Sequence, residues 1–220
     1  MHTVTDNNIK ATQVKSKKRV ADHGEVFTNE REVNAMLDLV KQETERIDSR
    51  FLEPACGNGN FLSEVLKRKL EVVSNRYGKS LIEWEPYCLV AIASIYGVDI
   101  LEDNAIECRK RLFDIFSKTY ISSFGLNCKL EFLKGIKFII ERNILWGNAL
   151  DFTNPVSKKP IVFSEWSMIN GNKIKRTDYI FKFLVEKTHQ FSLFNDEGNA
   201  AAIDEPVKDF PPIHYLKLGN

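Results

Sequence analysis

The chain has 220 residues, 43% of them hydrophobic and 28% charged, and its formal net charge at pH 7 is +1. These values are typical of a globular chain that forms one ordinary domain with a sizeable core, and the charge alone neither favours nor excludes a nucleic-acid partner. The sequence contains no signal peptide and no apolar run that could span a membrane, and its four cysteines form no CxxC pair. We therefore expect a cytoplasmic protein with reduced thiols, no membrane partner and no metal site.

The amino-terminal region divides into two parts. Residues 1–20 are polar and basic without apolar periodicity, which predicts a flexible basic arm. Beyond it, apolar residues recur at helical spacing from Val33 onward. The pattern predicts a helix that is capped by Thr28 or Asn29 and runs to about Thr44.

The next stretch, residues 51–62, reads FLEPACGNGNFL and predicts a strand, a tight turn and a helix. Gly57 and Gly59 allow the backbone to approach a ligand closely, and the start of the following helix offers unpaired N–H donors. The loop carries no basic residue, and Leu62 stands where a dinucleotide fingerprint would have its third glycine, so a pyrophosphate ligand is not expected. Glu53, at the end of the strand, can accept a hydrogen bond from a ligand ammonium group.

Two further strands are predicted downstream. A helix over residues 80–94 leads into a short apolar strand over residues 95–100, with Asp99 at its carboxyl end. A carboxylate there can accept hydrogen bonds from both hydroxyls of a ribose. The third strand lies within residues 143–152, NILWGNALDF, and is followed by Asn148, whose amide can both donate and accept.

These segments resemble the motifs of the amino-methylating DNA methyltransferases that use S-adenosylmethionine. The string EPACGNGNFL resembles motif I, GEVFTN resembles motif X with Asn29 in place of the usual Pro, GVDI resembles motif II and GNAL resembles motif III. The resemblance implies an α/β fold of the class I methyltransferase (Rossmann-like) type, a mostly parallel sheet flanked by helices. It also implies S-adenosyl-L-methionine as cofactor, bound by Phe27, Thr28, Glu53, Pro54, Ala55, Cys56, Gly57, Gly59, Asn60, Phe61, Asp99, Ile100, Asn148, Ala149 and Leu150.

A catalytic motif of the form [DNS]-P-P-[YFW] should follow on a fourth strand, because a base amino group is a poor nucleophile until acceptors take up its hydrogens. The expected position holds PIVFSEWS, a strand-like run without a double proline. Either Ser164, Glu165 and Trp166 form an unorthodox catalytic set, or the catalytic motif belongs to another chain.

The second alternative corresponds to a known pattern. The chain resembles the amino-terminal half of restriction-modification adenine methylases of the Eco57I-like group, in which a second polypeptide can supply the NPPY motif and target recognition. We therefore expect a methyltransferase domain over residues 21–166, an extension or partner-docking tail over residues 167–220, and DNA as a partner. Two other readings stay open: a non-catalytic methyltransferase-like regulatory module, and a self-sufficient methyltransferase that acts on another substrate.

Overall fold

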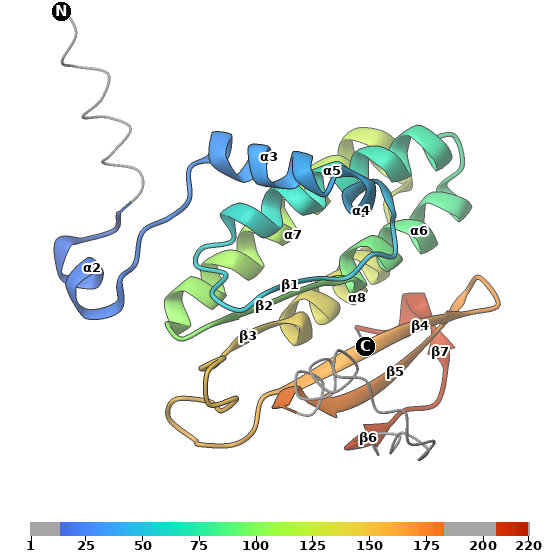
Figure 1. The fold of residues 1–220 in the computed structure, drawn as a ribbon. Coiled ribbons are helices and arrows are strands. Elements are labelled where there is room, and N and C mark those ends of the chain that lie inside the picture. Colours follow the sequence, from blue (N-terminus) through green and yellow to red (C-terminus); the bar gives the residue numbers. More distant parts are fainter. Residues whose placement is uncertain (1–13, 183–205, 220) are drawn as a thin grey trace, which may run out of the picture.

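The computed structural model describes residues 14–182 and 206–219. Figure 1 shows helices above a short central sheet and a long hairpin below it. In chain order the elements are α2 (Lys17–His23), α3 (Glu30–Leu39), α4 (Lys41–Glu45), β1 (Phe51–Glu53), α5 (Asn60–Tyr77), α6 (Leu81–Ala93), β2 (Ile95–Asp99), α7 (Glu102–Phe124), the 3-10 turn η1 (Gly125–Asn127), α8 (Leu130–Asn143), β3 (Ile144–Trp146), β4 (Val162–Ile169), β5 (Lys173–Ile180), β6 (Lys208–Asp209), β7 (Ile213–His214) and the 3-10 turn η2 (Tyr215–Lys217).

The three strands expected around the motifs form a parallel sheet in the order β1-β2-β3. Two helices, α5 and α6, connect β1 to β2, and α7 and α8 connect β2 to β3. Parallel neighbours require such crossovers, because the chain must return to the same end of the sheet before the next strand begins. The prediction of an α/β architecture with a Rossmann-like parallel sheet is confirmed at this level.

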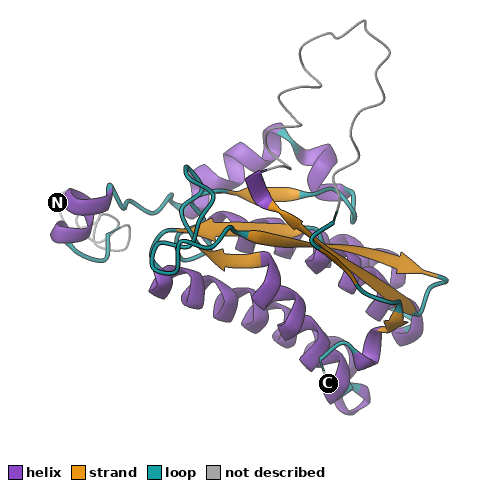
Figure 2. Cartoon of the chain, turned by 90° about the horizontal axis from the view of Figure 1, so that it is seen from below, coloured by secondary structure: helices purple, strands orange, loops and turns teal. Residues whose placement is uncertain are grey.

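Residues of β2 face the two sides of the parallel sheet in alternation. Ile95 belongs to the main core with the helices, and a Cβ on Gly97 would lie 2.9 Å from the side chain of Leu62 on α5. Val98 instead packs with Phe163 of β4 in a second apolar cluster. Because side chains alternate along a strand, α5 covers one face of this sheet and the hairpin covers the other; Figure 2 shows the hairpin side.

The strand that follows β3 departs from the expected topology. PIVFSEWS does form a strand, but β4 pairs antiparallel with β5 in a second, four-stranded sheet that also contains β6 and β7. A tight turn at Asn170 and Gly171, which both have positive φ, joins β4 to β5. The parallel sheet is therefore limited to three strands, the expected fourth strand belongs to a separate antiparallel sheet, and the boundary expected at residue 166 falls inside β4.

Both chain ends that the structure describes are held against the body of the protein. Residues 14–16 lead into α2, in place of the flexible arm expected over residues 1–20, of which residues 1–13 lie outside the described part. In the expected docking tail, Tyr215 is buried and its hydroxyl donates to Glu85 at 2.7 Å. Among residues 14–182 and 206–219, no helix combines the length and apolar character needed to cross a lipid bilayer.

A fully buried lysine on α5 fixes the segment that leads into β1. Lys69 Nζ donates to the carbonyls of Ile47 at 2.9 Å and Ser49 at 2.5 Å, and to Ser94 Oγ at 2.8 Å. Burial lowers the pKa of Lys69 to about 7. This side chain therefore loses its proton far more easily in the folded chain than in the unfolded chain.

We expect this lysine to give a measurable pH dependence. Between pH 7 and roughly 10.4, the unfolded chain holds the Lys69 proton more tightly, so the stability of the folded state rises with pH. The free energy of unfolding of the wild type, minus that of Lys69→Met, should increase by roughly 1–2 kcal/mol from about pH 7 to about pH 9. Urea unfolding at each pH measures it. Lys67→Met, on the same helix, is the control, and a difference that is flat with pH would show that Lys69 stays charged.

Candidate functional site

A pocket of about 380 Å³ lies at the carboxyl ends of β1 and β2. Its volume is within the range of roughly 300–1,000 Å³ common for small-molecule sites. The walls come from residues 24–28 before α3, residues 53–61 around the first turn of α5, and residues 99–104 at the start of α7, with Met36 added. Three segments that are far apart in the sequence thus enclose one space.

Ten of the residues expected to bind the cofactor line this pocket. They come from all three segments: Phe27, Thr28, Glu53, Ala55, Cys56, Gly57, Asn60, Phe61, Asp99 and Ile100. Pro54 and Gly59 belong to the same turn but do not line the pocket. The structure therefore brings together the residues of the motif X, motif I and motif II segments.

The turn between β1 and α5 depends on two glycines with positive φ. Gly57 has φ +53°, and a Cβ at this position would lie 3.1 Å from the ring of Phe27. Gly59 is the N-cap residue of α5 and has no side chain that could cap the helix. Its φ is +87°, and a Cβ there would lie 2.7 Å from Cys108 Sγ. The first N–H groups of α5 are thus left without a side-chain acceptor at the pocket.

Asn58 adds a second unpaired polar group in the pocket wall. Its side chain is buried, and its Oδ1 has no hydrogen-bond partner among the described residues. Buried polar atoms are nearly always paired in folded proteins, so an orphaned amide oxygen indicates a missing partner. Together with the start of α5, it marks this pocket as a place where a ligand with donors and acceptors fits.

Gly57→Ala should weaken ligand binding as well as the fold. A left-handed non-glycine residue costs roughly 1–2 kcal/mol, and the added methyl group would push Phe27 out of the pocket wall. For S-adenosylmethionine, the ligand that the motif resemblance implies, we expect about a tenfold lower affinity, measured by calorimetry. Gly171→Ala is the matched control, because Gly171 has φ +73° with nothing within 4 Å of its Cβ position. Equal affinity in both variants would contradict the proposed contact.

The Asp99 side chain connects the turn before α5 to the start of α7. Its Oδ2 accepts from the backbone N–H of Gly57 at 2.8 Å, and its Oδ1 accepts from the N–H of Leu101 at 2.8 Å and from Asn104 Nδ2 at 3.2 Å. The side chain is only 7% exposed. Each carboxylate oxygen has more than one acceptor direction, so Asp99 can fix the turn and still accept from a ligand hydroxyl.

The charge of the lining is acidic. Glu25, Glu53 and Asp99 contribute carboxylates, and no lysine or arginine lines the pocket. Burial raises the pKa of Glu53, whereas hydrogen bonds from Arg19 and Asn104 outweigh the effect of burial on Glu25 and lower its pKa. Such a lining favours a cationic ligand and disfavours a polyphosphate.

Cys56 lies within the turn but is not a candidate nucleophile. Its hydrogen bond with the Cys108 thiol, together with burial, raises the pKa of Cys56 far above the usual range. A thiol reacts as its thiolate, so Cys56 is a poor nucleophile, and both cysteines pack in the core. All four cysteines are free.

The sequence analysis missed Glu25, Asn104 and Asn58. Asn104 is 1% exposed, and its Nδ2 donates both to Glu25 Oε1 at 2.7 Å and to Asp99. Glu25 stands within the GEVFTN string, two positions before Phe27, so its place in this string was an available signal. The hydrogen bond from Asn104 to Glu25, 79 positions away, had no sequence signal.

The motif III residues do not line the pocket. Asn148 Oδ1 accepts from the backbone N–H of Leu150 at 2.9 Å, and its Nδ2 donates to Asp151 at 3.1 Å. Leu150 is exposed, and Ala149 packs against the second apolar cluster. The structure thus uses Asn148 within its own turn, a common local use of this side chain.

The side chains of the catalytic candidates Ser164, Glu165 and Trp166 also interact with residues outside the pocket. Ser164 is buried and its Oγ donates to Asp178 Oδ1 at 2.7 Å. Glu165 pairs with Arg50, and Trp166 Nε1 donates to Asn143 Oδ1 at 2.8 Å.

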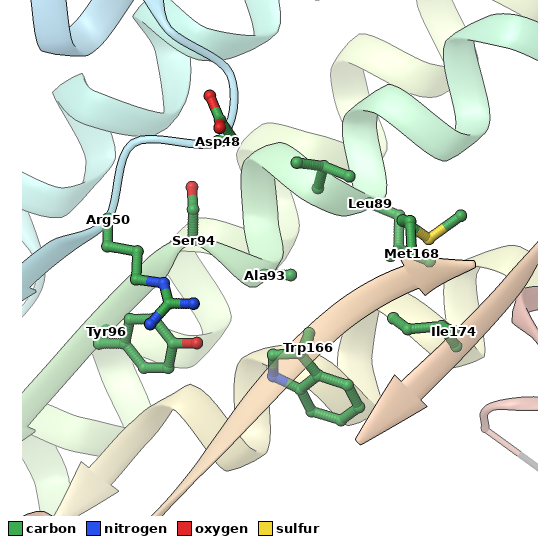
Figure 3. A pocket seen from close by; sticks show the side chains of 10 residues that line it. Asp48, Arg50, Leu89, Ala93, Ser94, Tyr96, Trp166, Met168 and Ile174 are labelled. Atoms are coloured by element: carbon green, nitrogen blue, oxygen red, sulfur yellow. The ribbon is translucent and has the colours of Figure 1, made fainter. Parts of the chain in front are cut away.

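A second cavity, of about 210 Å³, lies at the opposite end of the parallel strands. In Figure 3, Trp166 reaches this cavity from β4 and Arg50 reaches it from the segment before β1. It shares no lining residue with the first pocket. The structure therefore places Trp166 away from the predicted cofactor residues.

Comparisons with family models, with curated proteins and with solved structures found no match. Within the described ranges, no group of three or more His, Cys, Asp or Glu side chains could hold a metal ion. The interpretation of the site therefore rests on its geometry and on the motifs.

Proposed function

We propose that this chain is the S-adenosylmethionine-binding half of a DNA adenine-N6 methyltransferase of a restriction-modification system, and that a partner chain supplies the catalytic NPPY motif. The observation that carries the proposal is the single acidic pocket enclosed by Phe27, Gly57 and Asp99. The ligand pairs a positive sulfonium and ammonium group with a ribose and an adenine. Carboxylates suit the first two parts, and Asp99 can accept from the ribose hydroxyls.

The positions of the catalytic candidates support the split between two chains. Ser164, Glu165 and Trp166 have partners within the chain and lie away from the pocket. In addition, β1 is an edge strand, and no described strand pairs with its outer side. Leu52 on this strand is 46% exposed. A partner chain can add a strand at this edge and carry its catalytic residues to the pocket.

Calorimetry on the purified chain tests the cofactor proposal. We expect uptake of S-adenosylmethionine and S-adenosylhomocysteine, and none of NAD or ATP, because the acidic lining repels phosphates. Absence of uptake by the chain, both alone and with its partner, would refute it.

Methyl transfer separates the three functional readings. We expect label from methyl-tritiated S-adenosylmethionine to enter DNA only when a polypeptide with an NPPY strand is added. Binding without transfer by any reconstituted complex favours the regulatory module. Transfer by the chain alone favours a self-sufficient enzyme.

A further inference from the structure

Helix α2 and the loop that follows it, residues 24–28, which we call the strap, lie at the end of the molecule where α7 begins (Figure 1). The strap forms one wall of the acidic pocket. Phe27 of the strap packs against Gly57, and the carbonyl of Thr28 accepts from Asn60 Nδ2 at 3.0 Å. The position of the strap therefore decides whether the pocket is closed on this side.

Arg19 on α2 ties the strap to α7. Its Nε donates to Glu25 Oε2 at 2.5 Å, and its Nη1 donates to Asp103 Oδ2 at 2.6 Å. Lys15 adds an ion pair with Glu107 at 2.6 Å. The guanidinium of Arg19 lowers the pKa of Asp103 to about 2. A planar fork with several donors can hold two carboxylates from different segments at once.

Asn104 connects this cluster to the pocket. Its Oδ1 accepts from Lys15 Nζ at 2.8 Å and from Arg19 Nη2 at 3.2 Å. Its Nδ2 donates to Glu25 and to Asp99, as described above. Neither Lys15 nor Arg19 lines the pocket. Arg19 therefore acts on a ligand through Glu25, Asn104 and Asp99, whereas Lys15 also lies 5.7 Å from the ring centroid of Phe27.

We propose that Arg19 is a positioning residue for ligand binding: it clamps the strap over the pocket and fixes Asn104, which in turn orients the Asp99 carboxylate. This inference rests on the proposed function for the identity of the ligand, a nucleoside sulfonium. The clamp consists of partly exposed ion pairs, since Arg19 and Asp103 side chains are 25% and 54% exposed. Salt therefore weakens it.

The test compares Arg19→Ala with Arg19→Lys and Lys18→Ala. Lys18 lies on the same helix and has no ion pair among the described residues. In the ligand-free chain, Arg19→Ala should increase amide hydrogen exchange within residues 24–29 but not in the core helices. It should weaken binding of S-adenosylmethionine about tenfold, Arg19→Lys should restore part of the loss, and Lys18→Ala should behave as the wild type.

Salt gives a readout that a merely structural role would not produce. From about 0.05 M to about 0.5 M NaCl, binding by the wild type should weaken clearly, whereas binding by Arg19→Ala should change less. The inference is overturned if Arg19→Ala leaves amide hydrogen exchange unchanged, or if exchange increases over the whole chain. An unchanged affinity of Arg19→Ala for S-adenosylmethionine also overturns it. If the wild type takes up no S-adenosylmethionine, the proposed function fails, while the exchange experiment still decides whether the clamp exists.

Discussion

Replacing Asp99 by alanine should reduce the affinity for S-adenosylmethionine about 100-fold or more. The substitution removes the proposed acceptor for the ribose hydroxyls, and hydrogen bonds to a charged group contribute roughly 1.5–3 kcal/mol each. It also releases the N–H groups of Gly57 and Leu101, which Asp99 holds at 2.8 Å. The turn under the ligand would then lose its shape, so binding should fall for two reasons that act in the same direction.

Calorimetry of Asp99→Ala against Asp114→Ala measures this effect. Asp114 is an exposed carboxylate on the same helix as Asn104, so its loss changes the net charge equally without touching the pocket. Asp99→Asn should also bind weakly, because one of its two oxygens becomes an NH₂ group that faces a backbone donor. Affinity within threefold of the wild type in Asp99→Ala would remove Asp99 from the site.

Glu85→Ala should strongly destabilise the folded chain. Glu85 is fully buried and accepts from Tyr120 at 2.5 Å, from Tyr215 at 2.7 Å and from Lys129 at 2.6 Å. Burial, with the hydrogen bond to Glu85, raises the pKa of both tyrosines. Removing the common acceptor leaves three donors unpaired, which should lower the free energy of unfolding by roughly 3–5 kcal/mol.

Urea unfolding followed by circular dichroism gives the value for Glu85→Ala. Glu83→Ala, an exposed position on the same helix, should stay within about 0.5 kcal/mol of the wild type. A double-mutant cycle sharpens the test: Tyr215→Phe should cost about 1 kcal/mol in the wild type and almost nothing when Glu85 is already alanine. If the two changes are additive, Glu85 does not hold the carboxyl-terminal segment.

Local patterns sufficed for much of the fold. The Asn29 cap of α3, the strands β1 and β2 and the glycine turn before α5 follow from short-range spacing and from the conformational freedom of glycine. These same segments carry most of the pocket residues, because parallel strands bring their carboxyl ends to one edge. A sequence alone could therefore indicate both the pocket and its acidic character.

Contacts between residues far apart in the sequence could not be predicted in the same way. The apolar run of β4 predicts a strand, but its pairing with β5 depends on the turn at Asn170 and Gly171, which both have positive φ. The bond from Tyr215 to Glu85 spans 130 positions and has no local pattern. Arg19 was assigned to a flexible arm because a basic run in isolation resembles solvated surface.

The exposed side of β1 has a practical consequence for handling the protein. No strand of residues 14–182 or 206–219 pairs with the outer side of β1, and such an edge is a template on which an extended peptide can assemble, including another molecule of the same kind. Purified alone at high concentration, the chain should form soluble aggregates over time. Light scattering would detect them. Producing it together with the proposed partner chain, if that chain pairs with β1, should keep the preparation monodisperse.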